Sequence, residues 1–103
     1  MNYNHEAIFC IVNSGYSEAV MDAAKKLGAR GGTVINARGT APKDAETFFG
    51  ITIQPEKEIV LTVVDSKQKK QMMEIICERM SLEKQDSGIC FSLPINNVIG
   101  IAK

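Results

Sequence analysis

The sequence predicts one α+β domain, in which a four-stranded antiparallel sheet carries two helices on one face. Three observations support this class. Four short runs are rich in branched or aromatic apolar residues, and two longer segments repeat apolar residues at helical spacing. The segments follow the order strand, helix, strand, strand, helix, strand, which is the ferredoxin-like βαββαβ arrangement. The 103 residues suffice for one such domain over residues 1–103.

The first half of the chain supplies a strand, a helix and a second strand. The run AIFCIV at residues 7–12 is apolar on both faces and predicts a central strand. Ser17 is the expected N-cap of the helix that follows, and Gly28 is the residue expected to stop it. The run TVINA at residues 33–37 predicts the second strand.

The second half repeats the pattern. The run EIVLTVV at residues 58–64 predicts a strand, and Asp65 or Ser66 is the expected cap of a second helix. The final strand is expected over residues 89–93, with Pro94 ending it. The buried stripe of the second helix is expected to consist of Met72, Met73, Ile76, Cys77 and Met80.

One face of the predicted sheet lacks a cover. Right-handed crossovers place both helices on the same face, yet runs 7–12 and 58–64 carry apolar side chains on both faces. Each large apolar side chain that stays in water loses the roughly 1.5–3 kcal/mol of stabilisation that its burial would give. We therefore expect self-association through the uncovered face; the alternative is that residues 98–101 fold back over it.

Composition excludes several partners. The 12 Lys and Arg balance 12 Asp and Glu, so there is no basic excess with which to bind nucleic acid or an anionic membrane. The apolar run at 7–12 falls far short of the ~20 residues of a membrane span, so membrane insertion is not expected. The N-terminus lacks a basic leader region, and three cysteines without C-x-x-C spacing suit a reducing compartment. The predicted location is cytoplasmic.

Catalytic groups are sparse, so the chain is not expected to be an enzyme. His5 is the only histidine, and the three cysteines fall in apolar surroundings where a structural role is expected. A hydrolytic triad or a two-histidine metal site cannot be assembled within one chain. An enzyme would need an acid–base pair built across subunits.

The long connection at residues 38–56 is expected to project from the body. Part of it can form a hairpin, because residues 51–53 alternate and residues 54–57 suit a turn leading to the strand at 58. Phe48 and Phe49 either anchor a partner or tether the loop to the domain. Gly31, Gly32, Gly39 and Gly88 lie near strand ends, where they either admit an anion to the backbone or simply form turns.

The runs GGTVINARGTA, EIVLTVV and SGICFSLPINNVIGI resemble the nitrogen-regulatory P-II signalling family, over residues 6–101. The resemblance implies a homotrimer with adenine nucleotide, ATP or ADP, in clefts between subunits. It also implies a long loop that contacts target proteins such as membrane transporters or enzymes of nitrogen assimilation. No cofactor is required by such a regulator.

The resemblance assigns roles to individual positions. Gly31, Gly32 and Thr33 match the segment that contacts adenine from a neighbouring subunit, and Val63 matches a position lining the base pocket. Gly39 matches the root of the target-binding loop. That loop contains no tyrosine, so the resemblance implies no nucleotidylation of it.

The phosphate-binding part departs from the family pattern. Gly88 matches the last glycine of the nucleotide loop, but Ile89 replaces the lysine that follows, and Gly100 and Ala102 replace two arginines. Arg38, Lys43 and Lys84 are the cations expected to substitute in part. Because each charge-assisted hydrogen bond contributes ~1.5–3 kcal/mol, we expect weak triphosphate binding or a less charged effector. The alternative is a trimeric ferredoxin-like protein of another lineage that binds a metal or a small metabolite.

Overall fold

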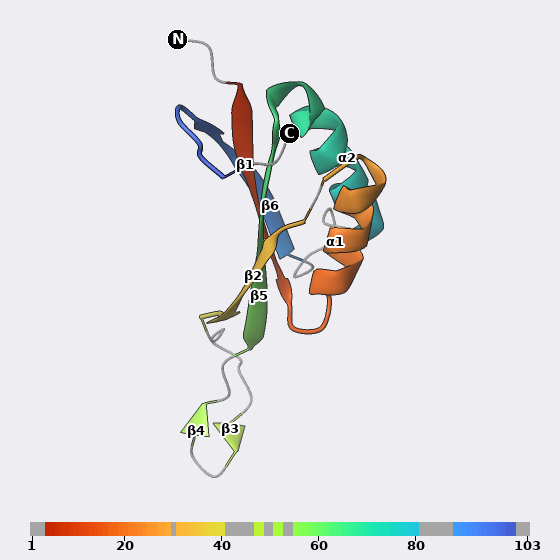
Figure 1. Ribbon diagram of the computed structural model, residues 1–103. Coiled ribbons are helices and arrows are strands. Elements are labelled where there is room, and N and C mark those ends of the chain that lie inside the picture. The colour runs from red at the N-terminus through yellow and green to blue at the C-terminus, as the bar shows by residue number, and fades with distance from the viewer. Residues whose placement is uncertain are drawn as a thin grey trace.

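The computed structural model describes residues 4–29, 31–40, 47–48, 51–52, 55–80 and 88–100. One sheet has the strand order β2-β5-β1-β6, and both helices cover the same face of it (Figure 1). The fold class predicted from the sequence is confirmed. The elements are β1 (His5–Asn13), α1 (Ser17–Lys26), β2 (Thr33–Arg38), β3 (Thr47–Phe48), β4 (Ile51–Thr52), β5 (Glu56–Asp65), the short 3₁₀ helix η1 (Ser66–Gln68), α2 (Lys69–Met80) and β6 (Gly88–Ile95).

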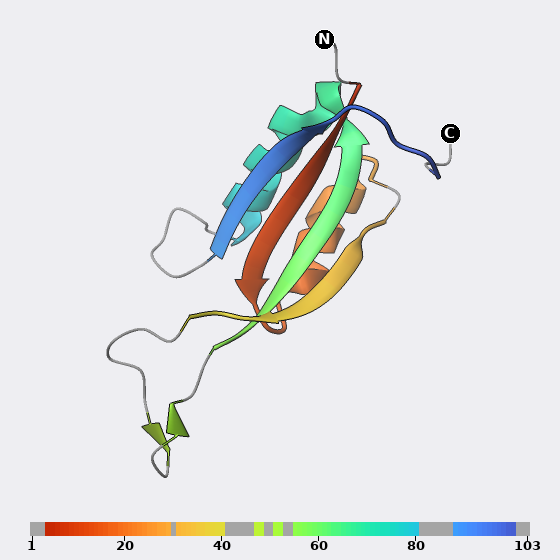
Figure 2. The ribbon, with the colours of Figure 1, turned by 90° about the vertical axis from the view of Figure 1, so that its left-hand side faces the viewer.

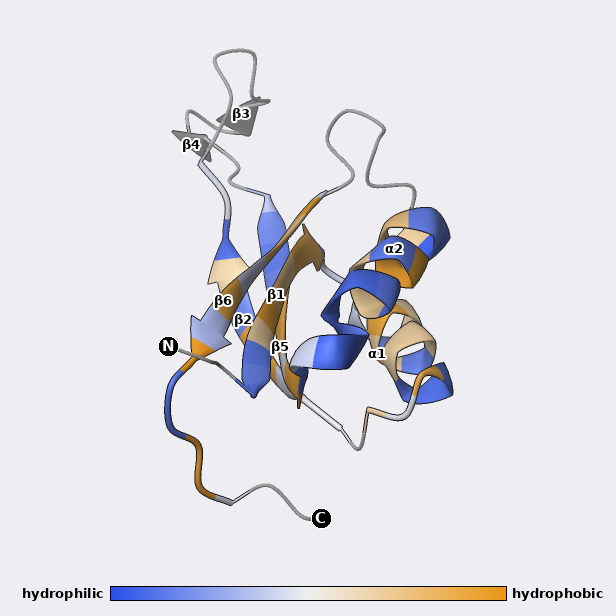
Figure 3. Ribbon diagram, turned by 90° about the horizontal axis from the view of Figure 1, so that it is seen from above, coloured by the Kyte–Doolittle hydropathy of each residue, from blue (hydrophilic) through white to orange (hydrophobic). Residues whose placement is uncertain are grey.

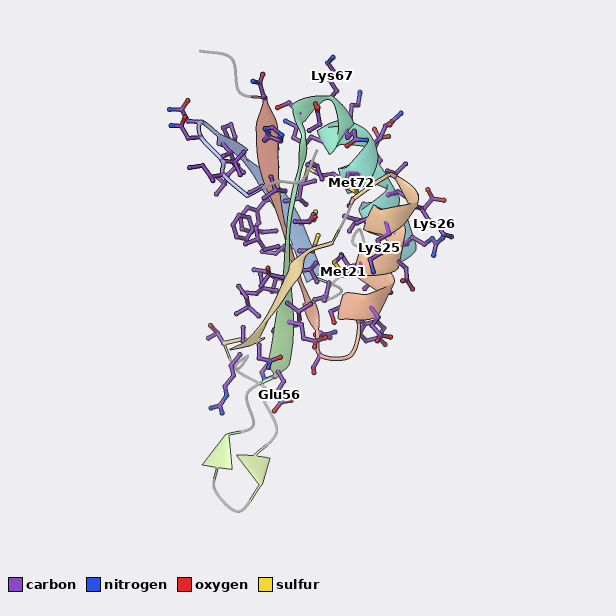
Figure 4. All side chains as sticks on the ribbon, viewed as in Figure 1. Met21, Lys25, Lys26, Glu56, Lys67 and Met72 are labelled. Carbon is purple, nitrogen blue, oxygen red and sulfur yellow. The ribbon has the colours of Figure 1, made fainter. Side chains whose placement is uncertain are left out.

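The core lies between the sheet and the two helices. Alternate residues of β1 and β5, such as Ile8 and Val60, point toward the helices and are fully buried. Met72 lies between α2 and the sheet, whereas Lys26 and Lys67 point outward (Figure 4). The predicted stripe of α2 is narrower than expected: Met72 and Ile76 are buried, but the other three predicted members are only half-buried. β1, β5 and β6 carry long apolar stretches (Figure 3).

The two helices begin in different ways. The prediction that Ser17 caps α1 is wrong, because Ser17 is already the first helical residue and no side chain at the cap position accepts a hydrogen bond. Instead, Glu58 of β5 accepts hydrogen bonds from the N–H groups of Gly15, at 2.8 Å, and Ser17, at 3.3 Å. The prediction for Asp65 is confirmed, since its carboxylate accepts from the N–H of Lys67 and so caps the 3₁₀ turn that leads into α2.

The prediction that Pro94 ends the last strand is also wrong, because β6 continues to Ile95. Proline lacks an N–H group and is confined in sheets to positions where no ladder hydrogen bond is needed. β6 is an edge strand that pairs only with β1, so Pro94 is accommodated there.

The long connection carries a two-stranded hairpin that projects from one end of the sheet (Figures 1 and 2). Its pairing differs from the expectation: β4 pairs with β3, with Phe48 opposite Ile51. The turn expected at residues 54–57 is wrong, because Glu56 and Lys57 already belong to β5 and pair with β2.

The face of the sheet opposite the helices is open in the single chain (Figure 2). All four strands place apolar side chains on this face. The side chains on the edge strands are the most exposed, and Ile89 has 57% of its surface exposed. Phe9 and Phe91 stack on this face with ring centroids 5.1 Å apart. The apolar residues of the open face are Ile35, Ala37, Ala7, Phe9, Ile11, Ile59, Leu61, Val63, Ile89, Phe91, Leu93 and Ile95.

The described part of the C-terminal segment does not cover this face. Ile99 is 99% exposed, and Val98 is exposed as well, so in the described part of the segment the fold-back alternative is wrong. Among the described residues, no helix has the length and apolar character needed to cross a bilayer.

Candidate functional site

A crevice of ≈520 Å³ lies at the end of the sheet away from the projecting hairpin. It is formed where β2 begins and β5 ends, beside the connection from α1 and the C-terminal segment. Four of the predicted site residues line it together: Gly31, Gly32, Thr33 and Val63. The remaining lining residues are His5, Gly28, Ala29, Leu61, Thr62, Val64, Asp65, Gln68 and Gly100.

The connection between α1 and β2, which contains Gly31 and Gly32, packs closely against β5. A Cβ atom placed on Gly32 would lie 2.8 Å from the carbonyl oxygen of Leu61 and 3.0 Å from the sulfur of Met21. Only glycine therefore fits at this position without displacing the backbone. The hydroxyl of Thr62, which is buried, donates a 3.0 Å hydrogen bond to the carbonyl oxygen of Gly31. These contacts fix one wall of the crevice.

A second contact holds the other side of the same connection. The side-chain amide of Gln68 in η1 donates a 3.1 Å hydrogen bond to the carbonyl oxygen of Leu27, just beyond α1. This carbonyl lies at a helix end, where intrahelical partners run out, so the amide completes its hydrogen bonding. The crevice is thus assembled by β5, η1 and the end of α1.

The described lining of the crevice is nearly free of fixed charge. Its ionisable side chains are His5 and Asp65, and neither lysine nor arginine is among the described lining residues. Leu61 and Val63 supply apolar surface, while backbone groups and Thr33 supply hydrogen-bonding capacity. The described lining therefore combines apolar contacts with hydrogen-bonding groups.

The other predicted site residues lie at the opposite end of the sheet. Arg38 lines a smaller crevice of ≈340 Å³ together with Ser14, Asn36, Ala37, Glu56 and Lys57. The N–H of Gly39 donates a 2.8 Å hydrogen bond to the carbonyl oxygen of Pro55, which joins the two chain segments at the root of the hairpin. Arg38 is five positions beyond Thr33 on β2, about 17 Å at strand rise.

Gly88 stands apart from both groups. It begins β6 and pairs with Val12, which in turn lies level with Glu58 and Asn36 across the sheet. Two strands separate it from β2, a span of about 14 Å. Lys43, Lys84 and Phe49 lie outside the described residues, and Phe48 is described only as part of the backbone of β3.

Within one chain the predicted residues therefore form separate groups. The crevice brings together Gly31, Gly32, Thr33 and Val63, while Arg38 and Gly39 mark the hairpin root and Gly88 the far edge. Sequence reasoning missed Thr62 and Gln68 as supports of the crevice. Their contacts join residues 31 and 41 positions apart, and no local pattern signals such a pairing.

No group of three or more potential metal-ligating side chains occurs in the described part of the chain. The described cysteines are all free thiols. The positions described so far thus offer a hydrogen-bonding and apolar crevice, a polar hairpin root and an open apolar face.

The described chain is thus a small ferredoxin-like domain with one bare sheet face and a projecting hairpin. The sequence model described as nitrogen regulatory protein P-II matches residues 5–103. The chain belongs to the P-II family, whose members are signalling proteins that act on target proteins and not enzymes. It is therefore a P-II-like signalling regulator.

A solved structure agrees with this assignment. The crystal structure of Arabidopsis thaliana PII bound to citrate superposes with a TM-score of 0.76 at 26% sequence identity. The match covers 97% of this chain and 85% of the plant chain. No curated protein matches the sequence.

Proposed function

We propose that the chain works in the cytoplasm as a homotrimeric regulator, in which a small effector between subunits controls how residues 38–56 engage a target protein. The observation that carries this proposal is the division of the site residues between the ends and edges of one sheet. A ligand cannot touch all of them in one chain. Neighbouring subunits could bring the groups together in a shared cleft.

The open face supports self-association. It is apolar across all four strands, and its edge residues retain large exposed fractions. Covering a contiguous apolar surface of this kind removes it from water at a gain of about 25 cal/mol per Å². Three copies packed around an axis would bury their open faces against one another and so remove them from water. This packing would also place β2 of one copy beside the neighbouring copy.

The effector that fits this arrangement is an adenine nucleotide whose base occupies the crevice of Gly31, Gly32, Thr33 and Val63. The near absence of charge in the described lining favours the base over the phosphates. Ile89, at the position where the resemblance expects a lysine, is an exposed apolar residue on the open face. We therefore propose that ADP or a less charged adenine compound binds at least as tightly as ATP.

The hairpin is proposed to contact the target. β3 and β4 pair with each other beyond the end of the main sheet and beyond the helices (Figure 1). A membrane transporter or an enzyme of nitrogen metabolism is the proposed class of target. Effector occupancy would change the population of the hairpin conformation that binds it.

Calorimetry with adenosine, ADP and ATP tests the effector proposal, using two glycine variants as a matched pair. Gly32→Ala places a Cβ against a backbone carbonyl and should displace the wall of the crevice. Gly39→Ala meets only the side chains of Pro55 and Lys57, at 3.2 and 3.3 Å, and these can shift. For adenosine, whose base is proposed to occupy only the crevice beside Gly32, we expect Gly32→Ala to weaken binding at least tenfold and Gly39→Ala to leave it within about twofold. Equal effects of the two variants, or no heat with any adenine compound, would refute the proposal.

A further inference from the structure

Two of the three cysteines meet across the sheet. Cys10 of β1 and Cys90 of β6 are direct partners in the antiparallel register, and both side chains point toward the helices. Their sulfur atoms lie 3.3 Å apart, although 80 residues separate them in sequence. Both are free thiols, and Cys77 lies elsewhere, on α2. No part of the proposed regulator mechanism uses this contact.

We propose that Cys10 and Cys90 form a reversible dithiol/disulfide pair, a modification site at which a small-molecule disulfide oxidises the protein to an intrachain β1–β6 disulfide. This inference does not rest on the proposed function. It requires only the fold, the register and the contact between the two sulfur atoms.

The geometry allows the bond with a small adjustment. Directly opposed residues of an antiparallel pair have Cβ atoms about 4.5–5.5 Å apart, whereas a disulfide needs about 3.5–4.5 Å. The strands must therefore approach by up to about 1 Å, and the sulfur atoms must close to about 2.05 Å. β6 is an edge strand bonded only to β1, so it can move toward β1 without breaking a second ladder.

Exposure decides which thiol reacts first. Cys10 is only 1% exposed, whereas Cys90 is half-buried and reachable from solvent. The contact with the Cys10 thiol lowers the pKa of Cys90, and the same contact together with burial raises the pKa of Cys10. Cys90 is thus the accessible sulfur with the greater thiolate character, which is the property that governs attack.

The reaction balances as two exchange steps. The Cys90 thiolate attacks one sulfur of the small disulfide, forming a mixed disulfide and expelling a thiolate. The Cys10 thiol then loses its proton and attacks the Cys90 sulfur, releasing the second thiolate. The two cysteines lose two electrons and two protons, and the small disulfide becomes two thiols.

Covering of the open face would leave this site unchanged. The neighbours of Cys90 in the strand, Ile89 and Phe91, point to the open face, whereas Cys90 points to the helix side. Association through the open face therefore does not bury the pair further. The disulfide would fasten the edge strand that carries Ile89 and Phe91 to the central strand β1.

The test is to incubate the folded full-length protein in a series of oxidised-to-reduced glutathione ratios, quench with an alkylating agent, and map the cysteines by mass spectrometry. We expect a Cys10–Cys90 linked peptide that grows as the ratio rises and disappears on return to reduced glutathione. Cys77→Ser is the matched control and should give the same yield. Cys10→Ser should instead accumulate the glutathione adduct at Cys90.

The wild-type protein alone suffices to overturn the proposal. Absence of the linked peptide at the highest ratio, a stable glutathione adduct in its place, or linkage through Cys77 would each do so. Native-state alkylation supplies a second measurement that needs no variant. Cys90 should react at least tenfold faster than Cys10, and the reverse order would refute the assigned attacking thiol.

Discussion

The two neighbouring residues Val34 and Ile35 provide a sharp test of association through the open face. Both lie on the edge strand β2, and each has 44% of its surface exposed. Val34 pairs with buried Val60 and points to the helix side, whereas Ile35 pairs with Ile59 on the open face. The variants Val34→Glu and Ile35→Glu therefore replace side chains that are buried to a similar extent in the single chain. They differ in the face of the sheet on which the new carboxylate lies.

The expected magnitude follows from exposure. Covering the remaining 44% of Ile35 gains about 0.7–1.3 kcal/mol, scaled from ~1.5–3 kcal/mol for complete burial. A glutamate at this position loses that gain and must also be desolvated without a partner, at a cost of several kcal/mol. A total near 4 kcal/mol weakens association about a thousandfold.

Sedimentation velocity over a concentration series measures the effect. We expect wild type and Val34→Glu to sediment as the same trimer, and Ile35→Glu to sediment as a monomer at micromolar concentration. Circular dichroism spectra of both variants would check that they remain folded. A wild-type monomer, or an Ile35→Glu trimer as stable as that of Val34→Glu, would refute the reasoning.

Three further variants test the fold and the crevice. The hydrogen bond from Gly15 N–H is the largest influence holding the pKa of Glu58 below its ordinary value of 4.5. The stability that this hydrogen bond contributes should be fully present above pH 4.5 and lost as the pH falls through the lower folded-state pKa. The melting temperature of Glu58→Gln should therefore depend less on pH across this acid range than that of the wild type. Ile76→Ala empties a fully buried site and should cost about 2–5 kcal/mol in urea unfolding, whereas a loss below about 1 kcal/mol would contradict its place in the core. Thr62→Val leaves the carbonyl of Gly31 without its partner and should cost about 1–3 kcal/mol; unchanged effector affinity in this variant would argue against a fixed crevice wall.

Local periodicity was sufficient to predict the four strands of the main sheet and the two α-helices, but not the pairing of β3 with β4. The apolar runs at 7–12 and 58–64 became the central strands β1 and β5, and each helix formed where apolar residues recur at helical spacing. Such patterns survive folding because a strand or helix must bury one side wherever it packs. Because runs 7–12 and 58–64 are apolar on both faces, the sequence also predicted that one face of the sheet would not be covered by the chain's own helices.

Residues that were predicted wrongly depend on distant partners. Ser17 has the chemistry of a cap, but Glu58 reaches the same amides from another strand. Pro94 was predicted to end the last strand, yet β6 continues through it because β6 pairs with β1 alone and has a free edge. Neither the capping partner nor the edge position can be read from the residues around them.

The sequence by itself determined the order of elements, the two-faced strands and the glycines that allow close backbone approach. Only the tertiary structure decided that Gly31, Gly32, Thr33 and Val63 share one crevice while Arg38 and Gly88 lie elsewhere, and that Cys10 meets Cys90. The physical reason is register. Strand pairing between segments far apart in the chain sets which side chains become neighbours, and a shift of one residue would turn each to the opposite face.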